Sequence, residues 1–217
     1  GIEAGTDGAD DPRSWTERFN SQGPEWQAPG IGETLEGNPD GKKPVVGGNT
    51  FVVVQADGDD LAHSDGRTAE KACQLLREHR NEPFFLGVGF VRPHVPFVAP
   101  AKYFQPFPFA AMNLPEKYPD DWADIPKLGI NYKTSQNMKM NLQQQRKSVA
   151  GYYASVAYMD AQVGKVLATL KEEGLEDNTI VVFTSDHGYH LGQHDFWAKV
   201  SLHEESATVP LIVCVPG

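Results

Sequence analysis

Short apolar runs alternate with amphipathic stretches along this chain, and this alternation limits the folds that it can adopt. The apolar runs have the length and composition of strands that are covered on both faces; they are residues 51–56, 83–91, 179–185 and 209–215. Between them, residues 64–79 and 141–173 repeat apolar side chains at helical spacing. Alternating strands and helices predict an α/β fold, in which a parallel-rich sheet is sandwiched by helices.

The longer helix has clear predicted ends, because Asn141 is a good N-cap residue and Gly174 a good stop. Residues 1–50 contain 10 Gly and 5 Pro, so they are predicted to form irregular loops that cover the rest. Residues 93–126 contain 8 of the 16 prolines together with many aromatic residues. We expect this segment to be an ordered loop that forms a lid or a pocket wall.

The net charge and the lengths of the apolar runs argue against two classes of partner, nucleic acids and membranes. There are 19 Lys and Arg against 29 Asp and Glu among the 217 residues, a net charge of −10, so general nucleic-acid binding is not expected. No apolar run approaches the length of a membrane span, and the first residues do not resemble an export signal. The chain begins without Met and stops directly after an apolar run, so we expect further sequence on both sides.

Two predicted strand ends carry the side chains best suited to chemistry, and ligands of open α/β sheets bind beyond such ends. Asp186 and His187 leave one strand together, before Gly188. One oxygen and one nitrogen donor on adjacent residues could both reach a metal ion. The alternative is an ordinary turn, in which Asp186 caps the backbone and His187 is solvated.

The second strand end carries His94 between two prolines, in the sequence RPHVP. The prolines restrict the backbone, so the imidazole could be presented to an anion or to a leaving group. Lys199 lies 13 positions after Asp186 and could fold back to neutralise an anionic substrate beside the metal. The alternatives are a histidine hydrogen-bonded within its own loop and a surface lysine.

Three blocks of the sequence together resemble the sulfatase family, whose fold is that of the alkaline-phosphatase superfamily, and are most similar to its iduronate-2-sulfatase branch. The blocks are VVFTSDHGYHLGQHDFWAK, FFLGVGFVRPHVPFVAP and YYASVAYMDAQVGKVLATL. The resemblance covers residues 51–217, which would be the central and later part of a catalytic domain. It implies that Asp186 and His187 ligate one Ca²⁺ ion, that His94 and Lys199 contact the sulfate, and that Tyr189 and His190 line the substrate side of the pocket.

The part of the family pattern that holds the nucleophile is missing from this sequence. Family members carry C-x-P-S-R, whose cysteine becomes formylglycine through a formylglycine-generating enzyme. Cys73 lies in a helical pattern and is predicted to be a buried helix residue, and Cys214 lies in the last strand. Asp59 and Asp60 follow a strand as the family's aspartate pair does, but their composition predicts a plain turn.

The resemblance implies a sulfuric ester hydrolase that acts on a sulfated sugar or glycan. The alternatives are a phosphate or phosphonate monoester hydrolase of the same superfamily, or a fragment that binds sulfated glycans without turnover. The resemblance to the sulfatase family implies that the protein works in the periplasm, in the lysosome or outside the cell. A parallel sheet that lacks strands exposes apolar edges, so we also expect the 217-residue chain alone to aggregate or to unfold easily.

Overall fold

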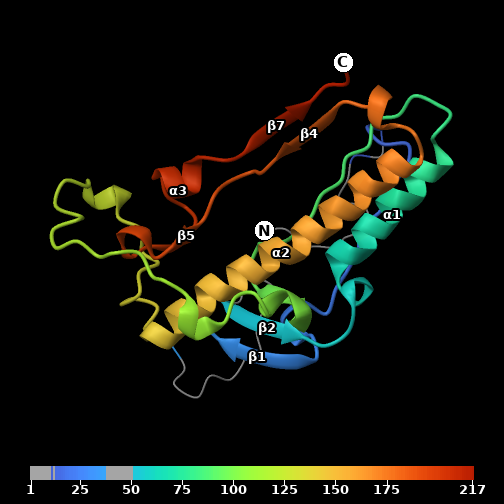
Figure 1. Ribbon diagram of the computed structural model, residues 1–217. Coiled ribbons are helices and arrows are strands. Elements are labelled where there is room, and N and C mark those ends of the chain that lie inside the picture. Colours follow the sequence, from blue (N-terminus) through green and yellow to red (C-terminus); the bar gives the residue numbers. More distant parts are fainter. Residues whose placement is uncertain (1–10, 12, 38–50) are drawn as a thin grey trace.

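The computed structural model describes residues 11, 13–37 and 51–217 (Figure 1). Within this part, two long helices lie beside three small sheets. The helices are α1 (Ser64–Glu78), α2 (Leu142–Glu172) and the short α3 (Glu204–Ala207); the strands are β1 (Gly30–Thr34), β2 (Val52–Ala56), β3 (Phe97–Pro100), β4 (Val181–Thr184), β5 (His190–Leu191), β6 (Trp197–Ala198) and β7 (Leu211–Cys214). Seven 3₁₀ turns also occur in the described residues: η1 (Glu25–Gln27), η2 (Asp60–Ala62), η3 (Ala101–Phe104), η4 (Phe109–Ala111), η5 (Lys127–Gly129), η6 (Glu176–Asn178) and η7 (Gln193–Asp195). None of the described helices is both long enough and apolar enough to cross a membrane.

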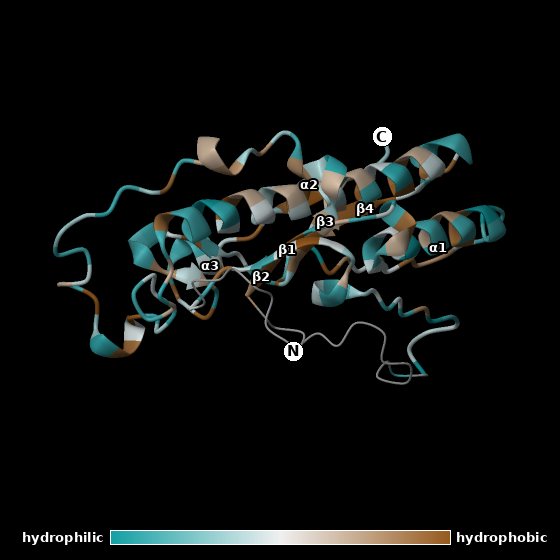
Figure 2. Cartoon of the chain, turned by 90° about the horizontal axis from the view of Figure 1, so that it is seen from below, coloured by the Kyte–Doolittle hydropathy of each residue, from teal (hydrophilic) through white to brown (hydrophobic). Residues whose placement is uncertain are grey.

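The central sheet has the order β1-β2-β3, with β1 antiparallel and β3 parallel to β2. Its two faces are covered by different parts of the chain, because side chains alternate along a strand. Val53 and Phe97 face the main apolar cluster, which includes residues of α2, whereas Val52 and Val54 face Ala28 and its neighbours. In Figure 2 the strands beside α2 carry the hydrophobic colour, while many turns of α1 and α2 are hydrophilic.

Helix α2 begins and ends as the sequence predicts. The Asn141 side chain accepts a hydrogen bond from the Gln144 N–H, and the Gln144 side chain accepts one from the Asn141 N–H, which makes a complete capping box. Gly174 follows the helix at φ +71°, a conformation that favours glycine. Gly151 lets the helix approach the sheet, since a Cβ there would lie 2.9 Å from Val53 Cγ2.

The last part of the chain forms two antiparallel pairs that are separate from the central sheet. β4 pairs with β7, and β5 pairs with β6. In Figure 1 the β4–β7 ribbon runs on the opposite side of α2 from β1 and β2. The strands predicted over residues 179–185 and 209–215 are therefore confirmed, but the expectation that they are buried is wrong, because every residue of β7 is exposed.

Two further predictions need correction. Residues 83–91 form no strand; they run without regular structure, and strand β3 begins only at Phe97. The side chains from Phe84 to Phe90 nevertheless alternate between half-buried and exposed, so this segment is extended but has no strand to pair with among the described residues. Gly30–Thr34 forms β1 where loops were expected, because β2 offers it a partner that sequence composition does not reveal. The expectation for residues 1–10, 12 and 38–50 lies outside the described residues, and the boundary at residue 50 stays a prediction.

Candidate active site

Three of the residues singled out in the sequence meet at the Lys199 side chain. Lys199 Nζ lies 3.0 Å from His94 Nε2 and 3.0 Å from His187 Nε2. His94 lies in the loop before β3, His187 follows β4, and Lys199 follows β6. The structure thus brings together side chains from two predicted strand ends and from the histidine-rich loop.

The hydrogen bonds of the two imidazoles determine where their protons lie. His94 Nδ1 is 2.6 Å from the Val95 carbonyl oxygen, and His187 Nδ1 is 2.7 Å from the Gly188 carbonyl oxygen. A carbonyl oxygen can only accept, so each Nδ1 carries the proton and donates it. Each Nε2 then has a lone pair, which accepts a hydrogen bond from the Lys199 ammonium.

Burial lowers the pKa of His94 below its ordinary value of 6.5, and the nearby Lys199 and Arg92 charges lower it further. The hydrogen bond to the Val95 carbonyl opposes this effect. His94 is therefore neutral at pH 7 in this arrangement. It can accept from Lys199, and it becomes a proton donor at Nε2 only when a bound anion favours the imidazolium.

The backbone around His94 is fixed by a buried arginine. Arg92 Nη1 donates to the carbonyl oxygens of His94, at 2.7 Å, and Pro96, at 2.8 Å. The same guanidinium forms an ion pair with Glu25. The Asp65 carboxylate, at the start of α1, accepts from the Val91 and Arg92 N–H groups, both at 2.9 Å.

These partners act on the position of His94 without contacting its ring. Burial raises the pKa of Asp65, while the Arg92 charge and the two N–H donors oppose that rise. Sequence reasoning missed Glu25, Asp65 and Arg92 as a group. They lie up to 67 positions apart in the chain, and no local pattern joins them.

Lys199 is held between two residues with unusual backbone conformations. Ala198 has φ +68° and Val200 has φ +75°, and a branched side chain rarely adopts such an angle. The Lys199 carbonyl oxygen accepts from Asn131 Nδ2 at 3.1 Å. Strained residues of this kind persist where the surrounding structure fixes them, as at binding sites.

Asp186 and His187 form an exposed corner at the end of β4. The Asp186 carboxylate accepts from the His187 N–H at 3.0 Å, and its side chain is 72% exposed. Asp186 Oδ2 lies 3.7 Å from His187 Nε2. Gly188 is required next, because a Cβ there would lie 2.1 Å from the Glu205 carbonyl oxygen.

This corner fits part of a divalent-cation site. An exposed carboxylate and an imidazole nitrogen 3.7 Å apart can both ligate one ion, provided that His187 Nε2 gives up the hydrogen bond from Lys199. Ca²⁺, however, takes six to eight ligands, mostly oxygens. Among the residues that the structure describes, no third His, Cys, Asp or Glu joins Asp186 and His187 into a metal-binding group.

The Tyr189 and His190 side chains contact groups other than the Lys199 side chain. The Tyr189 ring packs against Phe97 and Tyr152 in the main apolar cluster. Burial raises the pKa of Tyr189, and its hydroxyl has no hydrogen-bond partner in the described part of the chain. His190 is fully buried, and its Nε2 lies 2.9 Å from Ser201 Oγ. Their role toward a substrate stays a prediction.

The aspartates and cysteines that could stand in for the missing aspartate pair and nucleophile make contacts typical of structural residues. Asp59 caps a 3₁₀ turn by accepting from the Leu61 and Ala62 N–H groups, as a plain turn predicts. Asp60 forms an ion pair with Lys102. Cys73 is buried in α1, as predicted, and Cys214 is exposed in β7; both are free thiols.

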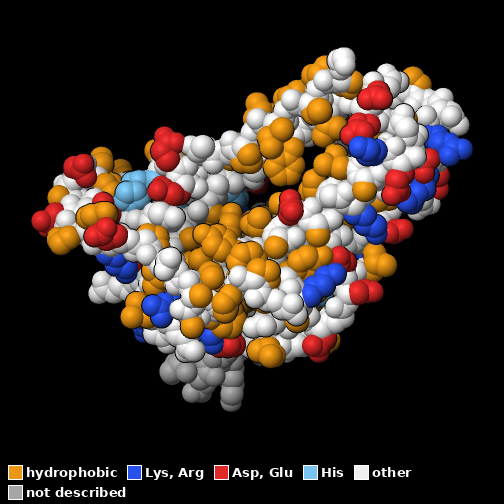
Figure 3. Space-filling view, in the orientation of Figure 1, with side chains coloured by type: hydrophobic (Ala, Val, Ile, Leu, Met, Phe, Trp, Pro, Cys, Tyr) orange, Lys and Arg blue, Asp and Glu red, His pale blue; other side chains and the backbone are white. Residues whose placement is uncertain are grey.

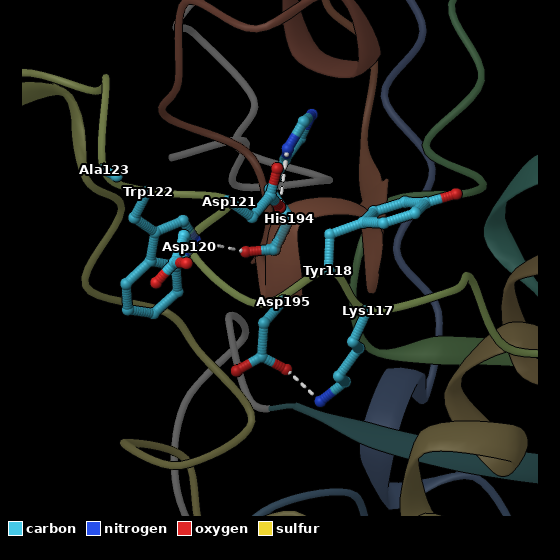
Figure 4. A pocket seen from close by; sticks show the side chains of 8 residues that line it. All are labelled: Lys117, Tyr118, Asp120, Asp121, Trp122, Ala123, His194 and Asp195. Carbon is cyan, nitrogen blue, oxygen red and sulfur yellow. Dashed lines mark hydrogen bonds and ion pairs between the residues drawn. The ribbon is translucent and has the colours of Figure 1, made fainter.

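A pocket of about 480 Å³ lies beside the histidine-rich loop (Figure 4). None of His94, His187 and Lys199 lines it. The segment 117–123 and the residues His194 and Asp195 line it. Lys117 Nζ donates to Asp195 Oδ1 at 2.5 Å, and Trp122 Nε1 donates to the His194 carbonyl oxygen at 2.7 Å. The proline-rich loop therefore does form a pocket wall, but at a different place from Lys199.

Comparison with known proteins identifies the family. A sequence model of the family described as Sulfatase matches residues 13–217, nearly the whole chain. The chain belongs to the sulfatase family. The match includes the blocks that carry His94, Asp186, His187 and Lys199.

Individual relatives agree with this family. The chain is 37% identical to the iduronate 2-sulfatase of Homo sapiens over 169 residues, and 33% identical to a sulfatase of Formosa agariphila over 163 residues. These matches cover 70% and 73% of this chain but only 30% and 32% of the relatives. The chain thus spans about three tenths of the length of these sulfatases.

Solved structures agree on the fold. The phosphonate monoester hydrolase SpPMH from Silicibacter pomeroyi superposes with a TM-score of 0.70 at 22% identity, covering 94% of this chain and 40% of its own. At this identity the likeness concerns the fold alone. It confirms the predicted class, an α/β fold of the alkaline-phosphatase type, although the sheet that this chain forms by itself is mixed.

Proposed function

We propose that this sulfatase-family protein hydrolyses sulfate esters, with His94 and Lys199 as the residues that contact the sulfate and His187 as a metal ligand beside them. The observation that supports this most directly is the position of Lys199 Nζ, 3.0 Å from both imidazole Nε2 atoms. An ammonium group has three N–H donors, and two are engaged here. The third is available for an oxygen of a bound sulfate ester.

The proposed roles follow from the proton positions. Lys199 neutralises the sulfate and stabilises the negative charge that develops as the ester bond breaks. His94 accepts a hydrogen bond from Lys199 in the free protein. Once the anion is bound, its charge raises the proton affinity of His94 Nε2, which takes up a proton from water and can then donate it to the leaving oxygen. Arg92 holds His94 in place for this transfer.

Asp186 and His187 are the residues that would hold a divalent cation, for which we propose Ca²⁺. Such an ion would add positive charge next to the sulfate oxygens. The nucleophile is proposed to be a formylglycine, made by a formylglycine-generating enzyme in a part of the natural protein that this chain does not contain. The proposed substrates are sulfated sugars or glycans, and the proposed compartments are the periplasm, the lysosome or the exterior.

A phosphate or phosphonate monoester hydrolase is the second candidate, supported by the structural likeness to SpPMH. A tetrahedral phosphoryl group presents similar oxygens to Lys199 and His94. The sulfatase family match favours sulfate. A sulfated-glycan-binding protein without turnover is the third candidate, since none of these residues is a nucleophile.

The test uses the protein expressed over its complete reading frame together with a formylglycine-generating enzyme. Release of sulfate and of phosphate from the corresponding aryl esters is measured with Ca²⁺ and after chelation. We expect Ca²⁺-dependent sulfate release, which His94→Asn and Lys199→Met each reduce by roughly 10²- to 10³-fold. The exposed Lys171→Met is the matched control and should keep full activity.

Each other outcome favours a different candidate. Faster phosphate release than sulfate release would replace the proposal with the phosphomonoesterase. A folded protein that turns over neither ester would favour glycan binding. Full activity in Lys199→Met would remove Lys199 from the site.

A further inference from the structure

Three histidines and a glutamate gather beside the candidate active site, and none of them is His94, His187 or Lys199. His190 lies in β5, His194 in η7, His203 directly before α3, and Glu205 in α3. Ligand atoms of His194, His203 and Glu205 all lie within 4.8 Å of one another. The rings of His194 and His203 have centroids 4.7 Å apart, and that of His190 is 5.9 Å from His203.

His190 presents a buried nitrogen that no protein group satisfies. Its side chain is fully buried, and its Nδ1 has no hydrogen-bond partner in the described part of the protein. That Nδ1 faces Glu205 Oε2 at 4.0 Å, which is too long for a hydrogen bond. The other nitrogen, Nε2, lies 2.9 Å from Ser201 Oγ and can donate to it, which leaves the Nδ1 lone pair free.

His194 is oriented in the way that metal-binding histidines usually are. Its Nδ1 lies 3.1 Å from Asp121 Oδ2, so it donates to a carboxylate. Its Nε2 then presents a lone pair, 4.0 Å from Glu205 Oε1. A carboxylate behind a histidine fixes the ring and its tautomer in many metal sites. Asp121 therefore gives His194 such a partner.

The Glu205 carboxylate thus faces two imidazole nitrogens at 4.0 Å, with one of its oxygens toward each. Lone pairs and a carboxylate repel one another across this gap unless a positive charge lies between them. Phe196, which is fully buried, packs on all three imidazole rings and closes the apolar side. Potential metal-ligand atoms therefore line one side of the gap, and the Phe196 ring closes the other side.

We propose that His190, His194, His203 and Glu205 bind one divalent transition-metal ion of the zinc class. Three nitrogens and one carboxylate oxygen suit Zn²⁺ better than Ca²⁺, which prefers oxygen. Zn²⁺ takes four such ligands at about 2.0–2.2 Å, so its ligand atoms lie about 3.3 Å apart. Glu205 needs to approach the nitrogens of His190 and His194 by about 0.7 Å each, and the other separations, which reach 4.8 Å among His194, His203 and Glu205, need to shrink by up to about 1.5 Å.

Four protein ligands leave no open position, so the ion is structural. It ties together β5, η7 and α3, and through Asp121 it also holds the proline-rich loop. The pocket that Asp121 and His194 line gives the ion a route from solvent (Figure 4). This proposal does not depend on sulfate hydrolysis.

The test is a Co²⁺ titration of the chelator-treated protein, followed by visible absorption and by displacement with Zn²⁺. We expect intense tetrahedral bands from one Co²⁺ per chain, and a higher melting temperature with Zn²⁺. His203→Gln and Glu205→Gln should each weaken binding more than about tenfold, and Asp121→Asn should weaken it by about tenfold. His79→Gln removes the histidine of the other described group that could hold a metal ion, Glu17, Glu78 and His79; it is the control and should bind as the parent does.

A variant that lacks the Asp186 and His187 side-chain donors, Asp186→Asn with His187→Gln, separates the two sites. It should keep the cobalt bands and the response to Zn²⁺. The proposal fails if this variant loses the bands, because the ion then lies at the other site. It also fails if His203→Gln and Glu205→Gln, with far-ultraviolet circular dichroism like that of the parent, bind Co²⁺ as tightly as the parent; the binding is then adventitious only.

Discussion

The central sheet and the β4–β7 ribbon are made from similar sequences but have opposite surroundings. Strand β3 is buried at every position, and β2 at four of its five. In the ribbon every residue of β7 is exposed, and β4 alternates between half-buried and exposed. Figure 3 shows hydrophobic side chains along this ribbon and a hollow between it and the body of the molecule.

An apolar run therefore predicts a strand, but it does not predict what covers that strand. β2 and β3 are covered because α2 supplies one partner surface and the segment around Ala28 another. No comparable surface lies against β7 within the described residues. The candidate active site joins the two regions, since His94 comes from the loop before β3 and His187 from the end of β4.

The largest expected difference between the regions is in stability. Phe97→Ala should lower the free energy of unfolding by about 3–5 kcal/mol, because it leaves a cavity between the sheet and α2. Ile212→Ala, in the ribbon, should change it by less than about 0.5 kcal/mol, because Ile212 is 59% exposed. Urea unfolding of the two variants measures the difference. Equal losses would show that the ribbon is packed in solution.

The next largest expected effect is on activity, through His94, which the loop before the buried strand β3 holds in the site. Arg92→Lys keeps the positive charge but cannot donate to both carbonyl oxygens and to Glu25 with the same geometry. We expect kcat for sulfate ester hydrolysis to fall about 10- to 100-fold, with little change in KM, because His94 is misplaced. Arg77→Lys, at an exposed arginine near Glu173, is the control. An unchanged kcat in Arg92→Lys would show that His94 needs no such support.

A smaller effect concerns pH and the packed region alone. Burial lowers the pKa of His63 below 6.5; the charges of Arg92 and Arg67 add to this, while Glu25 and the Asp57 backbone oppose it. Below about pH 6.5 the unfolded chain binds a proton at His63 that the folded chain does not, so acid lowers stability. His63→Phe removes this contribution and should lose less stability than the parent between pH 7 and pH 5. The free energy of unfolding in urea is measured for both proteins at pH 7 and pH 5. An equal decrease in the parent and in His63→Phe would contradict this prediction.

The smallest expected change in stability accompanies a change in association. Ile212→Lys places a charge on the exposed strand β7, where it costs little folding free energy. It should reduce aggregation of the 217-residue chain, measured by light scattering against concentration. The buried Val54→Lys should instead unfold the chain. A parent chain that stays monomeric and melts sharply and reversibly would contradict the expectation of aggregation.

Local signals in the sequence predicted what local physics determines. The Asn141 cap and the Gly174 stop depend on neighbours within four residues, so the ends of α2 were predictable. His187 was predictable as a candidate because it follows a strand, β4, and strand ends gather ligands. His94 was predicted from a strand over residues 83–91 that does not form, and Lys199 from its spacing to Asp186. The contact of Arg92 with Glu25 and the orientation of Tyr189 into the core were not. They depend on how distant segments pack, as does the failure of residues 83–91 to pair as a strand.

The most direct test of the shared Lys199 ammonium is nitrogen NMR of the histidine side chains in protein labelled with ¹⁵N-histidine. Near pH 7 both His94 and His187 should carry their proton on Nδ1, with Nε2 accepting a hydrogen bond. In Lys199→Met both Nε2 resonances should shift, and in the exposed Lys171→Met neither should. Protons on Nε2 in the parent would contradict the proposed hydrogen bonds from Lys199 to His94 and His187. Nε2 resonances that do not shift in Lys199→Met would contradict them as well.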